Sequence, residues 1–152
     1  MLYYIVMNLV YMKHAIEEAK KSGIDMPIAA VIVKNGEIIA SCHNQKELNN
    51  DVTAHAEILA IKKAENILKN WRLKDCDMYV TLEPCPMCAS AILQSRLSNL
   101  YFGAYDNIYG GFSVFPELKS KLNPNINIKG GILETECKEL LDDYFDKLRK
   151  NK

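Results

Sequence analysis

The stretch PIAAVIVKNGEIIASC, residues 27–42, decides how the fold begins. Two runs rich in β-branched residues, 27–34 and 37–42, flank the dipeptide Asn35-Gly36. Asn-Gly between two such runs is the strongest short-range signal for a β-hairpin, because both residues tolerate the positive φ of a tight turn. We therefore expect two antiparallel strands joined by a two-residue turn.

Helical patterns surround this hairpin on both sides. Before it, apolar residues recur at helical spacing over 9–19 and stop before Gly23, and the apolar residues 1–6 extend the same helix. After it, we expect a helix that begins with Thr53 as N-cap, a helix over 84–96, and a strongly amphipathic helix over 133–148. Strands are expected at 77–82, 99–104 and 126–128, with a helical turn near 116–121. This alternation predicts an α/β fold with three layers, α/β/α, around a central mixed sheet of about five strands.

The bulk composition indicates one soluble globular domain that spans residues 1–152. The formal net charge is zero, so no global field attracts nucleic acid, although a local basic patch is not excluded. The apolar N-terminus is too short to span a bilayer and lacks the basic flank of a signal peptide, so no membrane partner is expected. An odd number of cysteines, five, argues against a disulfide framework and for a cytoplasmic location.

Two short stretches carry candidate chemistry: TAHAEILA, residues 53–60, and EPCPMCAS, residues 83–90. Cys85 and Cys88 have metal-ligand spacing, which by itself also fits redox exchange or a core position. No second C-x-x-C is present, and His55 is the nearest nitrogen ligand. One imidazole and two thiolates leave an open position on zinc, where the pKa of a bound water falls from about 15.7 toward roughly 7.

Glu57 follows His55 by two positions and would serve as general acid and base beside the metal without being a ligand. Residues two apart lie on nearly opposite sides of a regular helix. His55 and Glu57 can therefore face one pocket only if they lie in the irregular first turn of their helix.

H-x-E followed by P-C-x-x-C is the signature of zinc-dependent nucleobase and nucleoside deaminases. More narrowly, the chain resembles the bacterial tRNA-specific adenosine deaminases over most of residues 7–149. The matching stretches are PIAAVIV, HNQKE, DVTAHAEILAI, NWRL, YVTLEPCPMCASAI, SRLSNLYFGAYD and GGILETECKELLDDYFDKLR.

This resemblance implies a cytidine-deaminase-like fold and a homodimer with one Zn2+ per subunit on His55, Cys85 and Cys88. The implied reaction is hydrolytic deamination of the wobble adenosine in a tRNA anticodon stem-loop to inosine. A zinc-activated hydroxide would attack the base, and Glu57 would shuttle protons.

The same resemblance implies further contacts around the target nucleotide. Asn44 would hydrogen-bond the purine, the Ala56 N–H would help fix the reacting groups, and Asp106 would contact the nucleotide backbone. The last helix, with Tyr144, Phe145 and Arg149, would pack beside the RNA. The chain departs from the family pattern at Ala29, usually glycine, and in YDNIYGGFSVF, residues 105–115, which lacks the usual lysine and Gly-Ser.

Other interpretations are open at this point. Asn44 and Asp106 are also common turn residues, and Tyr144 and Phe145 fit a helix core. A deaminase of a free base or nucleotide, of guanine or cytosine type, has the same motifs. A non-catalytic zinc scaffold is a third hypothesis, against which the presence of Glu57 argues.

Overall fold

The computed structural model describes residues 1–152 and confirms the hairpin. Strand β1, Ala29–Lys34, pairs antiparallel with β2, Glu37–His43. Asn35 and Gly36 form the turn with positive φ angles of 51° and 77°. The local turn chemistry of this dipeptide thus sets the first strand pair.

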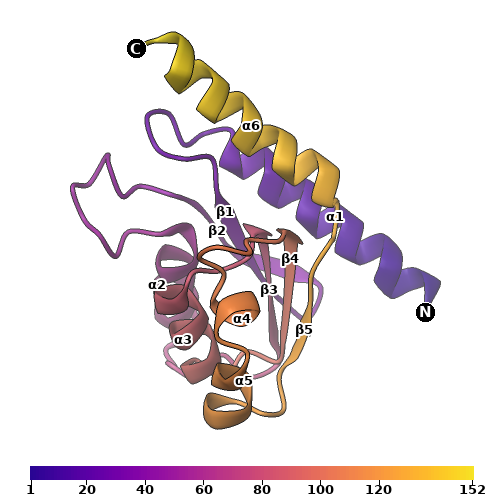
Figure 1. The fold of residues 1–152 in the computed structure, drawn as a ribbon. Coiled ribbons are helices and arrows are strands. Elements are labelled where there is room, and N and C mark those ends of the chain that lie inside the picture. Colours follow the sequence, from indigo (N-terminus) through magenta and orange to yellow (C-terminus); the bar gives the residue numbers. More distant parts are fainter.

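Three further strands complete a mixed sheet with the order β2-β1-β3-β4-β5 (Figure 1). They are β3, Cys76–Leu82, β4, Asn99–Ala104, and β5, Asn127–Lys129. β1 is antiparallel to both β2 and β3, whereas β3, β4 and β5 are mutually parallel. The predicted mixed sheet of about five strands is confirmed.

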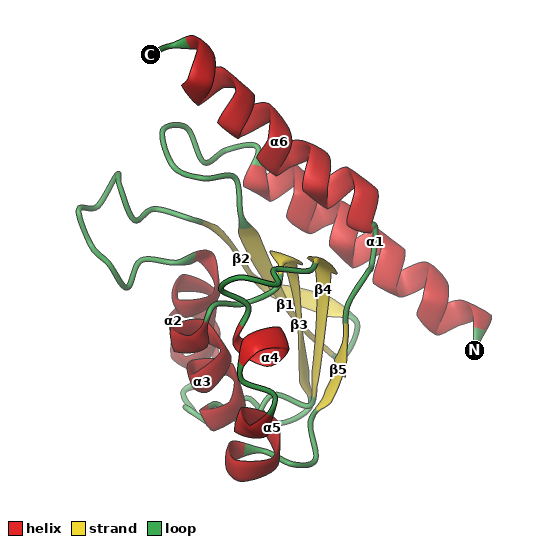
Figure 2. Ribbon diagram, viewed as in Figure 1, coloured by secondary structure: helices red, strands yellow, loops and turns green.

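Helices cover both faces of this sheet, which confirms the α/β/α arrangement (Figure 2). Helices α1, Leu2–Ala19, and α6, Glu134–Lys150, lie on one face. The other face carries α2, Ala56–Leu68, α3, Pro86–Gln94, and two short helices, α4, Gly111–Val114, and α5, Glu117–Leu122.

The alternation of side chains along β1 links the two layers. Ala30 and Ile32 join the core under α2 and α3, while Val31 and Val33 join the core under α1 and α6. A strand buried on both faces reads as a continuous apolar run, because neither side is available for polar residues.

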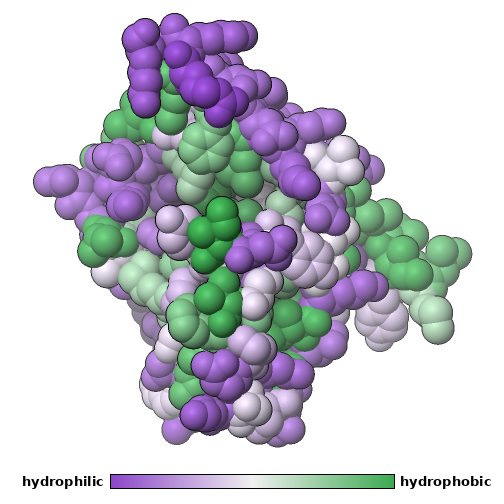
Figure 3. Space-filling view, viewed as in Figure 1, coloured by the Kyte–Doolittle hydropathy of each residue, from purple (hydrophilic) through white to green (hydrophobic).

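Helix α1 begins at Leu2, so the predicted extension of the first helix by its apolar N-terminal residues is confirmed. Those residues project beyond the sheet and are exposed, as the apolar tip in Figure 3 shows. No helix of the protein has both the length and the apolar character needed to cross a bilayer.

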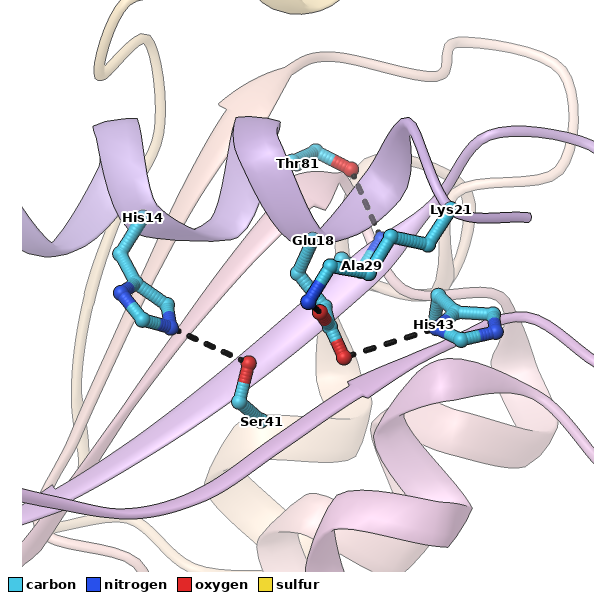
Figure 4. Close-up of polar contacts among 7 residues, drawn as sticks. All are labelled: His14, Glu18, Lys21, Ala29, Ser41, His43 and Thr81. Carbon is cyan, nitrogen blue, oxygen red and sulfur yellow. Dashed lines mark hydrogen bonds and ion pairs between the residues drawn. The ribbon is translucent and has the colours of Figure 1, made fainter.

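Polar contacts hold α1 against β2 near the end of that strand (Figure 4). The carboxylate of Glu18, which is almost fully buried, lies 2.9 Å from Lys21 Nζ and 3.5 Å from His43 Nδ1. Burial alone would raise the pKa of Glu18, but the hydrogen bonds with Lys21 and His43 outweigh it and lower the pKa. One turn earlier, His14 Nε2 lies 3.3 Å from Ser41 Oγ. These contacts fix the strand that leads into Asn44.

The structure corrects several details of the prediction. Thr53 is not the N-cap of α2: the hydroxyl of Thr53 donates to Asp51 Oδ1 at 2.8 Å, and His55 occupies the N-cap position. The turn formed by Asp51, which accepts hydrogen bonds from Thr53, therefore competes with helix capping and uses the threonine hydroxyl. Helix α3 ends at Gln94, two residues early, and α4 was not predicted. Phe145 is 42% exposed and is therefore not a core residue of α6.

The central position of β1 leads to a stability prediction. Ile32→Ala should lower the free energy of unfolding by about 2–5 kcal/mol, because Ile32 is fully buried in the core between the sheet and helices α2 and α3. Ile38→Ala in the paired strand is the matched control, since Ile38 is 37% exposed, and should cost less than about 1 kcal/mol. Urea unfolding followed by circular dichroism measures both, and equal losses would contradict the assignment of β1 as the strand shared by two cores.

Candidate metal centre and substrate pocket

The strand directions gather the candidate residues at one edge of the sheet. Because β1 is antiparallel to both of its neighbours, β2 points the same way as β3 and β4. The carboxyl ends of β2, β3 and β4 therefore meet at the same edge, which is where α/β sheets bind ligands. The segments that leave these strands carry Asn44, Cys85 and Asp106.

His55, Cys85 and Cys88 form the one cluster of potential metal ligands in the protein. Their ligand atoms all lie within 4.8 Å of one another. His55 Nδ1 is 3.4 Å from Cys88 Sγ and 3.7 Å from Cys85 Sγ. Tetrahedral zinc, with bonds of about 2.3 Å to sulfur and 2.0 Å to nitrogen, separates nitrogen and sulfur ligands by about 3.5 Å. The predicted trio is therefore brought together at the spacing that a tetrahedral metal site requires.

The two thiols are electrostatically unequal partners. The hydrogen bond from Cys88 lowers the pKa of Cys85 to about 4, despite burial that opposes the shift. The same hydrogen bond and burial raise the pKa of Cys88. The hydrogen bond with Cys85 also raises the pKa of His55. One negative charge is thus already stabilised in the cluster, and a cation would stabilise the second.

Local helix geometry resolves how His55 and Glu57 face the same space. His55 is the N-cap of α2, with extended backbone angles φ −74° and ψ 150°, and Glu57 is the second helical residue. The prediction that both residues lie in an irregular first turn is confirmed. Glu57 is 4% exposed and is not a member of the ligand cluster. Burial raises the pKa of Glu57 to about 7, which is a suitable value for a group that gives and takes protons near neutral pH.

A pocket of about 190 Å³ opens beside this cluster. It is lined by residues from all three strand ends and from the start of α2; they include Met26, Asn44, Lys46, His55, Ala56, Glu57, Glu83, Cys85, Asp106 and Tyr109. All the predicted substrate-binding residues, Asn44, Ala56 and Asp106, therefore border one cavity. Pockets for drug-sized ligands hold roughly 300–1,000 Å³, so this one is of a size for a single base.

Asn44 and Asp106 are both held by local hydrogen bonds. Asn44 Nδ2 donates to the Met26 carbonyl at 3.3 Å, and Asn44 Oδ1 accepts from the Lys46 N–H at 3.3 Å. One amide proton and one lone pair of Asn44 stay available to a ligand. Asp106 Oδ1 accepts from the N–H groups of Ile108 and Tyr109, at 3.0 and 2.9 Å. Asp106 therefore stabilises a turn, which is the alternative that the sequence left open for it.

Glu83, a pocket residue that is 2% exposed, was not predicted as a site residue. Its carboxylate accepts hydrogen bonds from the segment that follows β4, a contact between residues more than twenty positions apart. The position of Glu83, two residues before the first metal-ligand cysteine, was the one available signal.

A family comparison agrees with this geometry. Residues 7–149 match the family described as MafB19-like deaminase. The chain belongs to this deaminase family. Its His55, Cys85 and Cys88 cluster is the kind of site at which a deaminase binds a metal ion.

Individual relatives of this deaminase cover most of its length. It is 45% identical over 146 residues to the tRNA-specific adenosine deaminase of Bacillus subtilis, which covers 93% of this chain and 91% of the relative. A structure from studies of A-to-I editing by tRNA:A34 deaminases has 40% identity and a TM-score of 0.79, covering 86% of this chain and 97% of that one. The guanine deaminase of Bacillus subtilis has 37% identity and a TM-score of 0.64, covering 72% and 74%.

Metal content provides a direct test of the cluster. The deaminase should retain about one metal ion per chain after dialysis, and Cys88→Ala or His55→Ala should retain less than about a tenth of that, because two ligands hold the ion too weakly. Cys76→Ala is the control, since Cys76 is a buried cysteine outside the cluster. Plasma mass spectrometry measures the metal, and full occupancy in the Cys88→Ala protein would contradict the site.

Proposed function

We propose that this deaminase hydrolyses the wobble adenosine of a tRNA anticodon stem-loop to inosine. The observation that carries the proposal is the arrangement of Glu57, a buried carboxylate beside a cluster of three metal ligands but not part of it. The 45% identity to a tRNA-specific adenosine deaminase supports the choice of substrate.

Zinc is the metal that suits this donor set best. Two thiolates and one imidazole at tetrahedral spacing are typical zinc ligands, and three protein ligands leave one position free for catalysis. When bound there, zinc makes water acidic enough to act as a nucleophile near neutral pH. We propose one zinc ion per subunit, on His55, Cys85 and Cys88.

Glu57 would handle every proton of the reaction. Its carboxylate takes a proton from the attacking water and delivers it to N1 of adenine, as the new C6–O bond forms. Glu57 then moves the remaining proton of that water from the new C6 hydroxyl to the amino group, so that the C6–N bond breaks, ammonia leaves and the C6 carbonyl of inosine forms. The raised pKa of Glu57, about 7, lets the same group act as base and then as acid.

Asn44, Ala56 and Asp106 would hold the nucleotide while this happens. Asn44 offers one free amide proton and one free lone pair to the edge of the purine. Ala56 is the first residue of α2, where N–H groups have no acceptor within the helix, so its N–H can orient a reacting oxygen. Asp106 at the pocket border would contact the nucleotide backbone. Because the pocket has room for one base, the adenosine must leave its stack to enter.

Basic and aromatic residues of α6 lie against the segment that precedes β1. The Tyr144 hydroxyl donates to the Ile24 carbonyl at 3.3 Å, and Lys147 borders a cleft with Asp25 and Pro27. The neighbouring Met26 lines the substrate pocket itself. The last turn of α6 carries Lys147, Arg149 and Lys150, and these cations could bind RNA phosphates although the net charge of the chain is zero.

We also propose a cytoplasmic homodimer of single-domain subunits, each spanning residues 1–152. Apolar side chains gather in the middle of the face drawn in Figure 3, in front of α3 and α4. Exposed apolar residues of these helices and of the loops beside them are Met87, Ile108, Val114 and Phe115, and they could form a subunit interface. The cytoplasm follows from the chemistry of the ligands, because free thiolates persist in a reducing compartment.

The central test compares substrates and a Glu57 variant. The protein with zinc should convert adenosine to inosine in an anticodon stem-loop and leave free guanine and cytosine unchanged. Glu57→Gln should lower this rate by about 100- to 10,000-fold and keep its zinc, because only proton transfer is lost. Mass spectrometry of the products and of the metal measures both effects.

The control for that test is Glu65→Gln, at the opposite end of α2 and remote from the pocket, which should keep full activity. Turnover of free guanine or cytosine, without turnover of the stem-loop, would support the alternative of a free-base deaminase. Unchanged activity in Glu57→Gln would contradict the catalytic assignment.

A second prediction tests the RNA surface of α6. Lys147→Glu should raise the KM for the stem-loop by about three- to tenfold and leave kcat unchanged. The slope of log KM against log salt concentration should fall by roughly one, the value for one lost phosphate contact. Lys119→Glu is the control, because α5 lies at the far end of the molecule from the end of α6 (Figure 1). Equal effects of the two substitutions would argue against a specific RNA surface.

A further inference from the structure

Glu83 is a second buried carboxylate of the pocket that the proposed chemistry does not use. It follows β3 and lies two residues before Cys85. Its side chain is 2% exposed, yet no salt bridge of the protein includes it. A buried carboxylate is costly unless hydrogen bonds satisfy its oxygens, so its partners indicate its purpose.

All side-chain hydrogen bonds of Glu83 go to the segment 105–113 that follows β4. Oε1 accepts from the Asp106 N–H at 3.2 Å and from the Ser113 hydroxyl at 2.6 Å. Oε2 accepts from the N–H groups of Phe112 and Ser113 at 3.2 and 2.8 Å. Both ends of the segment are therefore tied to one carboxylate, by charge-assisted bonds of the stronger kind.

Glycines let the segment approach this carboxylate closely. A Cβ at Gly110 would collide with the carboxylate of Glu83 and with the Asp106 carbonyl. At Gly111 a Cβ would lie 2.5 Å from Ala89 Cβ and 3.1 Å from the Cys85 carbonyl, and the Gly111 N–H donates to the Pro84 carbonyl at 2.7 Å. The segment is packed directly against the turn that carries the first metal-ligand cysteine.

The segment in turn presents the pocket border to the substrate. Asp106, whose N–H is held by Glu83, uses its own carboxylate to fix the N–H groups of Ile108 and Tyr109. Asp106 and Tyr109 both line the pocket, and Tyr109 is 71% exposed, so its ring is available to a ligand. Loss of the Glu83 contacts would release both residues together.

We propose that Glu83 is a positioning residue that holds segment 105–113 as one wall of the pocket and so sets how tightly the target nucleotide binds, without transferring protons. This inference rests on the proposed function for its substrate. The position of the wall itself does not depend on which base is bound.

Glu83→Gln tests the inference with almost no change in volume. An amide offers one oxygen where the carboxylate offers two, so two of the four donors lose their acceptor whichever way the amide points. We expect the KM for the anticodon stem-loop to rise about tenfold, with kcat within about threefold and the zinc content unchanged. Ser113→Ala removes one of the four donors and should raise KM only about twofold.

Gly110→Ala should reproduce the effect of Glu83→Gln, because it pushes the segment away and leaves the charge near the metal intact. The matched control is Asp77→Asn, which changes a partly buried carboxylate near the start of β3, at the opposite edge of the sheet, where it accepts a hydrogen bond from Asn99. This control should leave KM unaltered.

Amide hydrogen exchange supplies a readout that needs no substrate. In the zinc-loaded protein, Glu83→Gln and Gly110→Ala should accelerate exchange at residues 106, 112 and 113 by about tenfold or more, and Asp77→Asn should not. Unchanged exchange in Glu83→Gln, loss of its zinc, or a fall in kcat at constant KM would overturn the inference. Accelerated exchange in a protein that deaminates no stem-loop would instead refute the proposed function and leave the role of Glu83 standing.

Discussion

The direction of three strands is the constraint on which the site depends. β1 is antiparallel to β2 and to β3, and β3 is parallel to β4, so three carboxyl ends meet at one edge. Reversal of any one of these strands would move its following loop to the opposite end of the sheet. The metal cluster, the purine-binding candidate Asn44 and the wall around Asp106 would then not share a pocket. Catalytic geometry is here a consequence of strand pairing.

Two helix N-termini at that edge supply the favourable electrostatics for the metal cluster. His55 is the N-cap of α2 and Cys85 is the N-cap of α3, and neither helix has a side-chain cap that would satisfy its first N–H groups. The positive ends of both helix dipoles therefore point toward the cluster, where thiolates must carry negative charge. The same irregular turn at the start of α2 brings Glu57 to the side of His55, which a regular helix would not permit.

Features that depend on neighbouring residues in the sequence could be predicted, and features that depend on distant contacts could not. The Asn35-Gly36 turn and the H-x-E and C-x-x-C motifs each carry their own local signal, and all three are placed as the sequence indicated. The N-cap prediction for Thr53 was wrong because a threonine hydroxyl can either cap a helix or bond to a residue in a neighbouring turn. Here it donates to Asp51. The only local signal for Glu83 was its place two residues before Cys85, since its four donors come from a segment that lies beside it because β4 pairs with β3.

Glu57 and Glu83 show how two buried carboxylates of one pocket can have different functions. Both are at most 4% exposed, but the segment 105–113 directs four hydrogen bonds to Glu83. For Glu57, burial outweighs the hydrogen bonds that it receives and raises its pKa to about 7. A carboxylate in which each oxygen accepts two hydrogen bonds is suited to hold structure, because it fixes four donors at once. A carboxylate whose charge is only partly compensated can gain and lose a proton at little cost, so its surroundings suit Glu57 to proton transfer and Glu83 to positioning.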